Sequence, residues 1–203
     1  MAVHSTAKKK GASDKRDRIL KAAIKVFAKN GFYATRVSEI AKAAGVADGT
    51  IYLYFKNKDD VLITIFEDGI QQLLVILREV AVSEEPFDQR ITRIIELQLG
   101  LLEEQRDLAE VITVNLRQSS SLLKQYAAPL FVEYIEVIAG LVREGQKEGA
   151  FRKDINSRVV ARSLFGALDA ILLTWALGEA DPASLRKAAS HCANLFLGGL
   201  RTR

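Results

Sequence analysis

The 203-residue sequence predicts an all-α fold of about nine helices, in which a small N-terminal module is followed by a longer helical part. Apolar residues recur at spacings of three and four along most of the chain, which is the period of a half-buried helix. No segment alternates convincingly with the period of two that a strand requires. Only three prolines interrupt the pattern, and there are no repeats or low-complexity linkers. We therefore expect a compact part from about residue 13, after a disordered basic tail over residues 1–12.

Three helices are expected in the N-terminal module, residues 13–57. The first begins at Ser13, a good N-cap residue, and ends at Gly31. Its apolar residues share one face: Ile19, Leu20, Ala23, Ile24 and Phe27. The second helix covers "VSEIAKAA" before Gly45, and the third covers "DGTIYLYF", opened by Asp48. A turn of about three residues joins these two short helices, which is the length that a helix-turn-helix uses.

Longer helices are expected in the second part, residues 58–203. The first of them, over about residues 58–80, spans the boundary and should connect the two parts mechanically. Another, over residues 122–149, should bend at Pro129, because proline cannot donate its helical hydrogen bond. Capping residues or prolines mark the expected starts: Asn57 with Asp60, Pro86, Asp107, Asn156 or Ser157, and Asp181 with Pro182.

Charge is distributed unevenly along the chain. Residues 1–60 hold 13 Lys and Arg against 6 Asp and Glu, whereas residues 61–203 hold 16 against 19, so a net charge of +4 conceals a basic first third. This asymmetry indicates a polyanionic partner for the first third alone. A basic tail that merely keeps the domain solvated is the alternative.

Several protein classes are excluded by what the sequence lacks. Cys192 is the single cysteine, and the basic N-terminus is not followed by the apolar run of a signal peptide. The longest apolar run, "ALDAILLTWAL", is about half the length that a bilayer needs and contains Asp169. There is no nucleotide-binding, zinc or nucleophile motif, and neither His4 nor His191 has a catalytic partner nearby in sequence. We expect a cytoplasmic protein that is not an enzyme, spans no membrane and needs no metal or cofactor.

The stretch "GVADGTIYLYFKNKDD" predicts a DNA-binding surface. In the third helix, Ile51 and Phe55 lie four residues apart and can face the core. This turns Thr50 and Tyr54 outward, and Tyr52 and Leu53 more obliquely. A threonine can contact a base edge, tyrosine hydroxyls can reach phosphates, and a glycine permits close approach of the backbone. The alternative, that the two tyrosines are half-buried packing residues, stays open. The residues expected at DNA are Arg36, Ser38, Gly49, Thr50, Tyr52, Tyr54, Lys56 and Lys58.

The segment "GFYATRVSEIAKAAGVADGTIYLYFKNKDDVL" resembles the DNA-binding module of the TetR family of bacterial transcriptional regulators. The resemblance covers about the first third, and it implies a double-stranded operator as partner and a C-terminal ligand-binding and dimerisation domain. In such a homodimer the last two helices form a four-helix bundle with the partner. Small residues that would permit close helix contact occur there: Gly166, Ala167, Ala170, Gly198 and Gly199. Packing of these residues within the monomer is the alternative.

The segments "ADGTIYLYFKNK", "NLRQS" (Asn115 to Ser119) and "LLTWAL" resemble the TetR-type repressors of fatty-acid degradation, which long-chain acyl-coenzyme A releases from DNA. Apolar side chains would bind the chain, and arginines would meet phosphates. The expected ligand-binding residues are Leu99, Leu102, Arg106, Arg117, Phe131, Tyr134, Phe165, Leu168, Asp169 and Trp175.

Three alternatives remain for these residues. Each apolar one can belong to the core instead, because any helical core needs such a stripe. Asp169 either binds a cationic ligand, which would favour lipophilic drugs as effectors, or pairs with a backbone, arginine or tyrosine partner. An architectural DNA-binding protein without an effector is the third possibility.

The resulting hypothesis is a dimer that places two copies of the helix over residues 48–55 into successive major grooves, about 34–36 Å apart. It would block transcription at a near-palindromic operator. Ligand binding would tilt the helix over residues 58–80 and change that separation.

Overall fold

A computed structural model describes residues 3–103, 105–118, 127–178 and 183–202. Nine α-helices form this part of the chain, so the prediction of an all-α fold is confirmed. A single isolated bridge between Phe151 and Arg201 is the only β-type pairing among these residues. The helices are α1 (Val3–Asn30), α2 (Val37–Ala44), α3 (Asp48–Ile51), α4 (Lys58–Ala81), α5 (Phe87–Glu103), α6 (Arg106–Glu110), α8 (Ala128–Lys147), α9 (Ser157–Leu177) and α10 (Ala183–Leu200).

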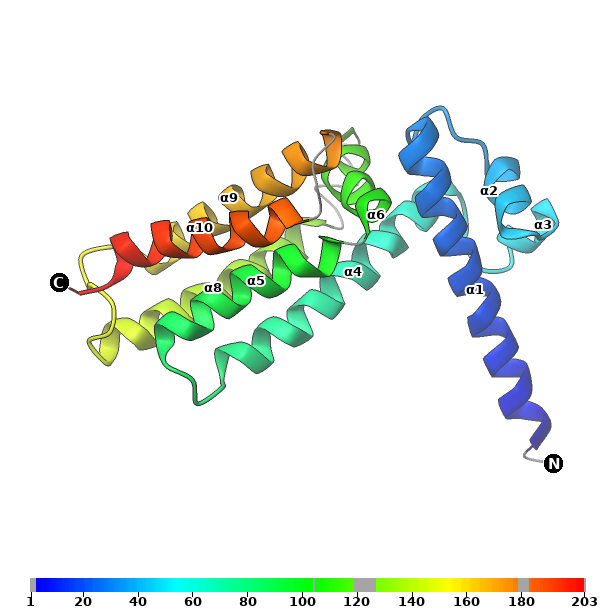
Figure 1. The fold of residues 1–203 in the computed structure, drawn as a ribbon. Coiled ribbons are helices and arrows are strands. Elements are labelled where there is room, and N and C mark those ends of the chain that lie inside the picture. Colours follow the sequence, from blue (N-terminus) through cyan, green and yellow to red (C-terminus); the bar gives the residue numbers. More distant parts are fainter. Residues whose placement is uncertain (1–2, 104, 119–126, 179–182, 203) are drawn as a thin grey trace.

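The N-terminal module consists of α1, α2 and α3, as the sequence indicates (Figure 1). Gly45 has φ of 64° and ends α2, and the Val46 N–H donates to the Ala41 carbonyl at 3.0 Å. This left-handed cap needs a residue without a Cβ penalty, which explains the glycine between the two short helices. The module encloses its own apolar residues, among them Ile19, Phe27 and Ile51, which are buried.

Helix α1 differs from expectation at its start. It begins at Val3, whereas the sequence analysis placed the cap at Ser13 and a disordered tail before it. Ala7, three consecutive lysines and Ala12 precede Ser13, and these good helix formers allow the helix to continue instead of ending there. Figure 1 shows this end of α1 projecting away from the other helices, beyond the core of the module.

The second part of the chain is a helical bundle. Helix α8 packs on α9, α10 packs on α5, and α4 runs along the bundle from the module, as expected for a connecting helix (Figure 1). Helix α9 is the one described helix whose length and apolar composition would suffice for a bilayer. Here it packs against α8 and α10 and buries one side, which includes Leu164, Leu168 and Leu172.

One predicted element is only partly described, and another takes a different form. Pro129 lies in the first turn of α8 as described, where its missing N–H is not needed. The residues directly before Ala127 lie outside the described residues, so the expected bend at Pro129 stays a prediction. The expected helix after Asp107 is divided into α6, a π-helical turn η1 (Val111–Asn115) and a 3-10 turn η2 (Leu116–Gln118). Residues 122–126 of the expected long helix and the start at Asp181 and Pro182 lie outside the described residues.

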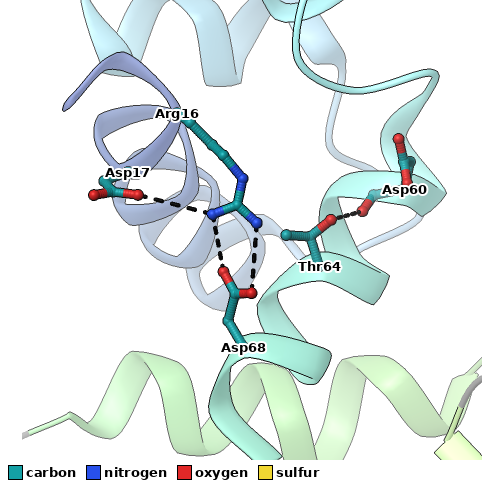
Figure 2. Close-up of polar contacts among 5 residues, drawn as sticks. All are labelled: Arg16, Asp17, Asp60, Thr64 and Asp68. Atoms are coloured by element: carbon teal, nitrogen blue, oxygen red, sulfur yellow. Dashed lines mark hydrogen bonds and ion pairs between the residues drawn. The ribbon is translucent and has the colours of Figure 1, made fainter. Parts of the chain in front are cut away.

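Beyond the first turn of α4, two polar links among the described residues join the module to the bundle. Arg16 of α1 donates to both carboxylate oxygens of Asp68 on α4, at 3.1 and 3.4 Å (Figure 2). The second link is buried: the Phe32 N–H donates to Oδ1 of Asn115 at 2.7 Å, and Asn115 is 1% exposed. An unpaired group at such a position would cost about 1–3 kcal/mol, so this bond fixes η1 against the end of α1.

Candidate nucleic-acid interface and ligand cavity

The face of α3 and the turn after it has the predicted arrangement. Ile51 and Phe55 are buried, whereas Tyr52 and Leu53 are 58% and 81% exposed. Beyond Ile51 the chain keeps helical hydrogen bonding, because the Phe55 N–H donates to the Ile51 carbonyl at 3.0 Å. Gly49 is exposed, and a Cβ placed on it would meet nothing within 4 Å. This end of the module therefore offers an open surface for close approach.

Polar side chains surround that surface. Arg36, Ser38 and Lys56 are exposed, and Thr50 is partly exposed. Arg36 precedes α2, where its backbone N–H donates to the Glu39 carboxylate at 2.7 Å. Its guanidinium and the start of α2 both favour an anion here. All four predicted residues are therefore accessible from solvent on or beside α2 and α3.

The two tyrosines behave differently. Tyr52 is exposed, so its ring and hydroxyl are accessible from solvent. Tyr54 is partly buried and packs against the apolar core, which matches the packing role that the sequence left open. Contact with DNA through Tyr54 would therefore involve only part of the side chain. The structure reverses the expected order of the two tyrosines, because Tyr52 and not Tyr54 is the more exposed.

Lys58 has a different role from the expected phosphate contact. Its Nζ donates to the carbonyl oxygens of Phe32, Tyr33 and Thr35 at 2.7, 3.1 and 2.9 Å. The same ammonium lies 4.6 Å from the centre of the Phe32 ring. Because an ammonium has three N–H groups, all of its donors are occupied. The structure does not support a phosphate contact by Lys58: the side chain holds the turn between α1 and α2 against α4.

We therefore expect Lys58→Met to destabilise the protein by about 1–3 kcal/mol, because three carbonyls lose a charged donor. The salt dependence of DNA binding should stay unchanged. Lys56→Met is the matched control: this lysine is exposed, so its loss should leave stability unchanged and lower the salt slope by about one unit. Chemical denaturation and DNA titrations over a salt series measure both effects. Equal salt slopes for wild type and Lys56→Met, or a reduced slope for Lys58→Met, would contradict the assignment.

An apolar cavity of about 460 Å³ lies within the bundle, between α4, α5, η1, α8 and α9. Four aromatic rings form part of its wall, each edge-on to the next: Phe66 with Phe131, Phe131 with Phe165, and Phe165 with Tyr134, at centroid distances of 5.6, 5.1 and 5.3 Å. Such a volume and lining are typical of a site for a small apolar ligand.

Six of the predicted ligand-binding residues line this cavity: Leu102, Arg117, Phe131, Tyr134, Phe165 and Asp169. The other four do not. Leu99, Leu168 and Trp175 are buried in the core, which is the alternative that the sequence could not exclude. Arg106 is exposed at the start of α6, where its Nε donates to the Ala176 carbonyl at 3.2 Å. It fastens α6 to the end of α9 and does not reach the cavity wall.

The charged pair of the wall is Arg117 with Asp169, which form an ion pair. Asp169 therefore has the arginine partner that was one of its two predicted roles. Because the guanidinium offsets its charge, the carboxylate is not an unpaired site for a cationic ligand. The same contact leaves Arg117, which is exposed, at one edge of the cavity.

Several residues of the wall were missed by the sequence analysis. Some of them lie on α4: Phe66, Gly69, Ile70 and Leu73. The others lie on α6, η1 and η2: Leu108, Ile112, Thr113 and Leu116. These belong to helical apolar stripes, so the only available signal was the stripe itself. Gln98 of α5 was also missed; it is 7% exposed and accepts a hydrogen bond from the Tyr134 hydroxyl at 2.6 Å. Burial raises the pKa of Tyr134 well above its ordinary value, so the hydroxyl stays protonated.

The predicted dimer residues lie on open helix surface with one exception. Gly166, Ala170, Gly198 and Gly199 are exposed, and a Cβ on any of the three glycines would meet nothing within 4 Å. Ala167 is partly buried against the core of its own bundle. Exposed apolar residues accompany the glycines, with Val159 on α9 and Leu195 on α10 at 55% and 76%.

Comparison with protein families accounts for both parts of the chain. Residues 19–65 match the model of bacterial regulatory proteins of the tetR family. Residues 66–199 match the model of the C-terminal region of YsiA-like protein.

Individual relatives are similar over most of their length. The chain is 35% identical over 162 residues to the fatty acid metabolism regulator protein of Bacillus subtilis, which covers 80% of the chain and 84% of that relative. The fatty acid degradation regulator FadR from Bacillus halodurans superposes with a TM-score of 0.84 at 34% identity, over 93% of the chain and 97% of that structure. FadR from Bacillus subtilis, in complex with stearoyl-CoA, gives a TM-score of 0.81 at 33% identity, over 90% and 97%.

Proposed function

Because the chain belongs to the TetR family of bacterial regulatory proteins, we propose that it is a cytoplasmic, homodimeric transcriptional repressor that long-chain acyl-coenzyme A releases from its operator. The observation that carries the effector is the apolar cavity of about 460 Å³, in a chain 33% identical to a regulator solved with stearoyl-CoA. The regulated genes would belong to fatty-acid metabolism, and no catalytic role is proposed.

The structure favours this effector over the two alternatives. A lipophilic cation would need an unpaired acidic group, but Asp169 is paired with Arg117. An architectural DNA-binding protein has no need of an apolar cavity, which costs stability when it is empty. A long acyl chain uses the cavity, because its methylenes fill it. The anionic end of coenzyme A would then lie at the edge, where it competes with Asp169 for Arg117.

Operator binding is assigned to the exposed face formed by Arg36, Ser38, Gly49, Thr50 and Tyr52. Two copies of this face, related by a twofold axis, would enter successive major grooves of a near-palindromic site. Lys56 and the start of α2 would contact phosphates, which positions the module but does not select a sequence.

Thr50→Ala should reduce discrimination among operator variants by about 1–3 kcal/mol, because a side chain at a base edge carries sequence information. Affinity for unrelated DNA should change little. Titrations of wild type and variant against the operator and single-base variants of it measure the difference. Gln71→Ala, at an exposed position of α4 outside the N-terminal module, is the control. Full discrimination by Thr50→Ala would remove Thr50 from the base-reading residues.

The cavity is connected to the module through both polar links described above. Gly69, in the cavity wall, directly follows Asp68, the partner of Arg16. Asn115, the partner of Phe32, lies between the wall residues Thr113 and Leu116. A ligand that moves α4 and η1 apart therefore displaces both attachments of the module. Such a ligand changes the equilibrium between module orientations that bind DNA and orientations that do not. The size of this change is set by the ratio of the ligand's affinities for the two states.

A titration of labelled operator DNA tests the proposal directly. The protein should bind the operator, and a saturating long-chain acyl-coenzyme A should weaken that binding, whereas free coenzyme A should have little effect. Equal responses to free coenzyme A and to the thioester, or no response to either, would refute acyl-coenzyme A as the effector. Monomers that bind the operator as tightly as the intact protein would refute the dimer.

A further inference from the structure

A polar pair interrupts the apolar wall of the cavity. Gln98 on α5 and Tyr134 on α8 both line it, and they are 7% and 0% exposed. The Tyr134 ring stacks edge-on with Phe165 at 5.3 Å, so the pair adjoins the aromatic part of the wall. Neither side chain is required by the helix-turn-helix or by the links to it. Burying the polar groups of a glutamine and a tyrosine here carries a desolvation free energy that leucine and phenylalanine would avoid.

The hydrogen bonds within the pair leave donors unused. The Tyr134 hydroxyl donates to Oε1 of Gln98 at 2.6 Å, and this is the only hydrogen bond of either side chain among the described residues. The two N–H groups of the Gln98 amide therefore have no acceptor in this part of the chain. Exchanging the amide oxygen and nitrogen does not change the result, because one N–H and the tyrosine O–H would then lack acceptors.

A buried donor without an acceptor is costly, at about 1–3 kcal/mol, unless a bound molecule supplies the acceptor. Gln98 lines the cavity and is 7% exposed, and its amide nitrogen is not among the fully buried atoms that lack a partner, so the N–H groups are accessible to whatever fills the cavity. A ligand with an acceptor at this depth can therefore hydrogen-bond to them. In an acyl thioester the carbonyl oxygen is the acceptor that directly adjoins the apolar chain. The saturated chain beyond it offers none.

We propose that Gln98, held by Tyr134, donates a hydrogen bond to the thioester carbonyl oxygen of the effector. The inference rests on the proposed function, and it makes Gln98 a specificity-determining residue that distinguishes an acyl thioester from long-chain ligands without a carbonyl group. Tyr134 is a positioning residue, since its hydroxyl fixes the amide oxygen and thereby directs the amide N–H groups into the cavity.

The test compares two ligands of equal chain length, palmitoyl-coenzyme A and its thioether analogue, in which a CH₂ group replaces the carbonyl. Dissociation constants are measured for the wild type, Gln98→Met and Gln71→Met. Methionine has a length similar to that of glutamine but no N–H group, and Gln71 is exposed on α4 outside the wall. Wild type and Gln71→Met should bind the thioester about tenfold or more tightly than the thioether. Gln98→Met should bind the two within about twofold.

The possible outcomes distinguish a failure of this inference from a failure of the proposed acyl-coenzyme A function. If the wild type binds neither ligand, the acyl-coenzyme A function fails, and the inference fails with it. If the wild type binds both equally well, or if Gln98→Met keeps the preference, the function stands and only the role of Gln98 is refuted. Infrared spectroscopy of a ¹³C-labelled thioester carbonyl on the wild-type protein removes any dependence on the folding of the variant. A band at lower wavenumber than that of the same thioester in an apolar solvent supports the hydrogen bond, and a band at the apolar-solvent position overturns it.

Discussion

Gly166→Trp should produce a folded monomer whose operator affinity is lower than that of the wild type by at least about 100-fold. Gly166 is exposed on α9, and nothing within 4 Å would obstruct a side chain there, so the variant should retain its fold. A second chain packed closely on this face would collide with the indole. A monomer loses the contacts of the second module, whose binding is effectively intramolecular in the dimer.

Sedimentation and operator titration measure both parts of this prediction. Val75→Trp is the control, because Val75 is 51% exposed on α4, and α4 lies on the other side of the bundle from α9 (Figure 1). It should leave the dimer and the operator affinity unchanged. A Gly166→Trp dimer as stable as the wild-type dimer would place the interface on a different surface.

The second large effect is expected from the length of the acyl chain. Each buried methylene contributes about 0.8 kcal/mol, so four methylenes alter the free energy of binding by about 3 kcal/mol, or roughly 150-fold. Palmitoyl-coenzyme A should therefore bind far more tightly than lauroyl-coenzyme A and should release the operator at correspondingly lower concentration. Free coenzyme A buries no chain, so it should release the operator poorly.

Leu73→Trp makes this prediction specific to the cavity. Leu73 lines the wall, so a larger side chain there should reduce the room for a chain and shift the preference towards shorter acyl groups. Val75→Trp places the same side chain two residues along α4, outside the wall, and should keep the wild-type preference. Isothermal titration with acyl chains of increasing length measures the shift. An affinity independent of chain length in the wild type would show that the chain does not enter an apolar site.

Local signals explain why the helices were predictable. The Asn57 side chain accepts from the Asp60 N–H at 2.8 Å, as the spacing of these residues indicates, and Asn156 accepts from the first N–H groups of α9. Ile51 and Phe55 are buried while Tyr52 is exposed, because a helical period assigns residues to faces before any partner is known. The start of α1 was not predictable in this way, since no residue before Ser13 forces a boundary.

Contacts between distant segments explain what sequence reasoning missed. Lys58 was expected at a phosphate, yet its acceptors lie 23 to 26 residues earlier in the chain. Asp169 had two possible roles until Arg117, 52 residues away, was placed beside it. Leu99 and Leu102 belong to the same helix, but only Leu102 lines the cavity.

The sequence by itself therefore determined the all-α class, the positions of most helices and the helix-turn-helix face, because spacing, caps and glycines act within a few residues. Only the tertiary structure decided which apolar residues enclose a cavity and which fill the core. It also decided that Gln98 faces Tyr134 and that Lys58 binds backbone carbonyls. The physical reason is that the apolar face of one helix can pack equally well against the apolar face of any other helix. The neighbour is chosen by how α4, α5, α8 and α9 cross, which depends on the packing of all of them together.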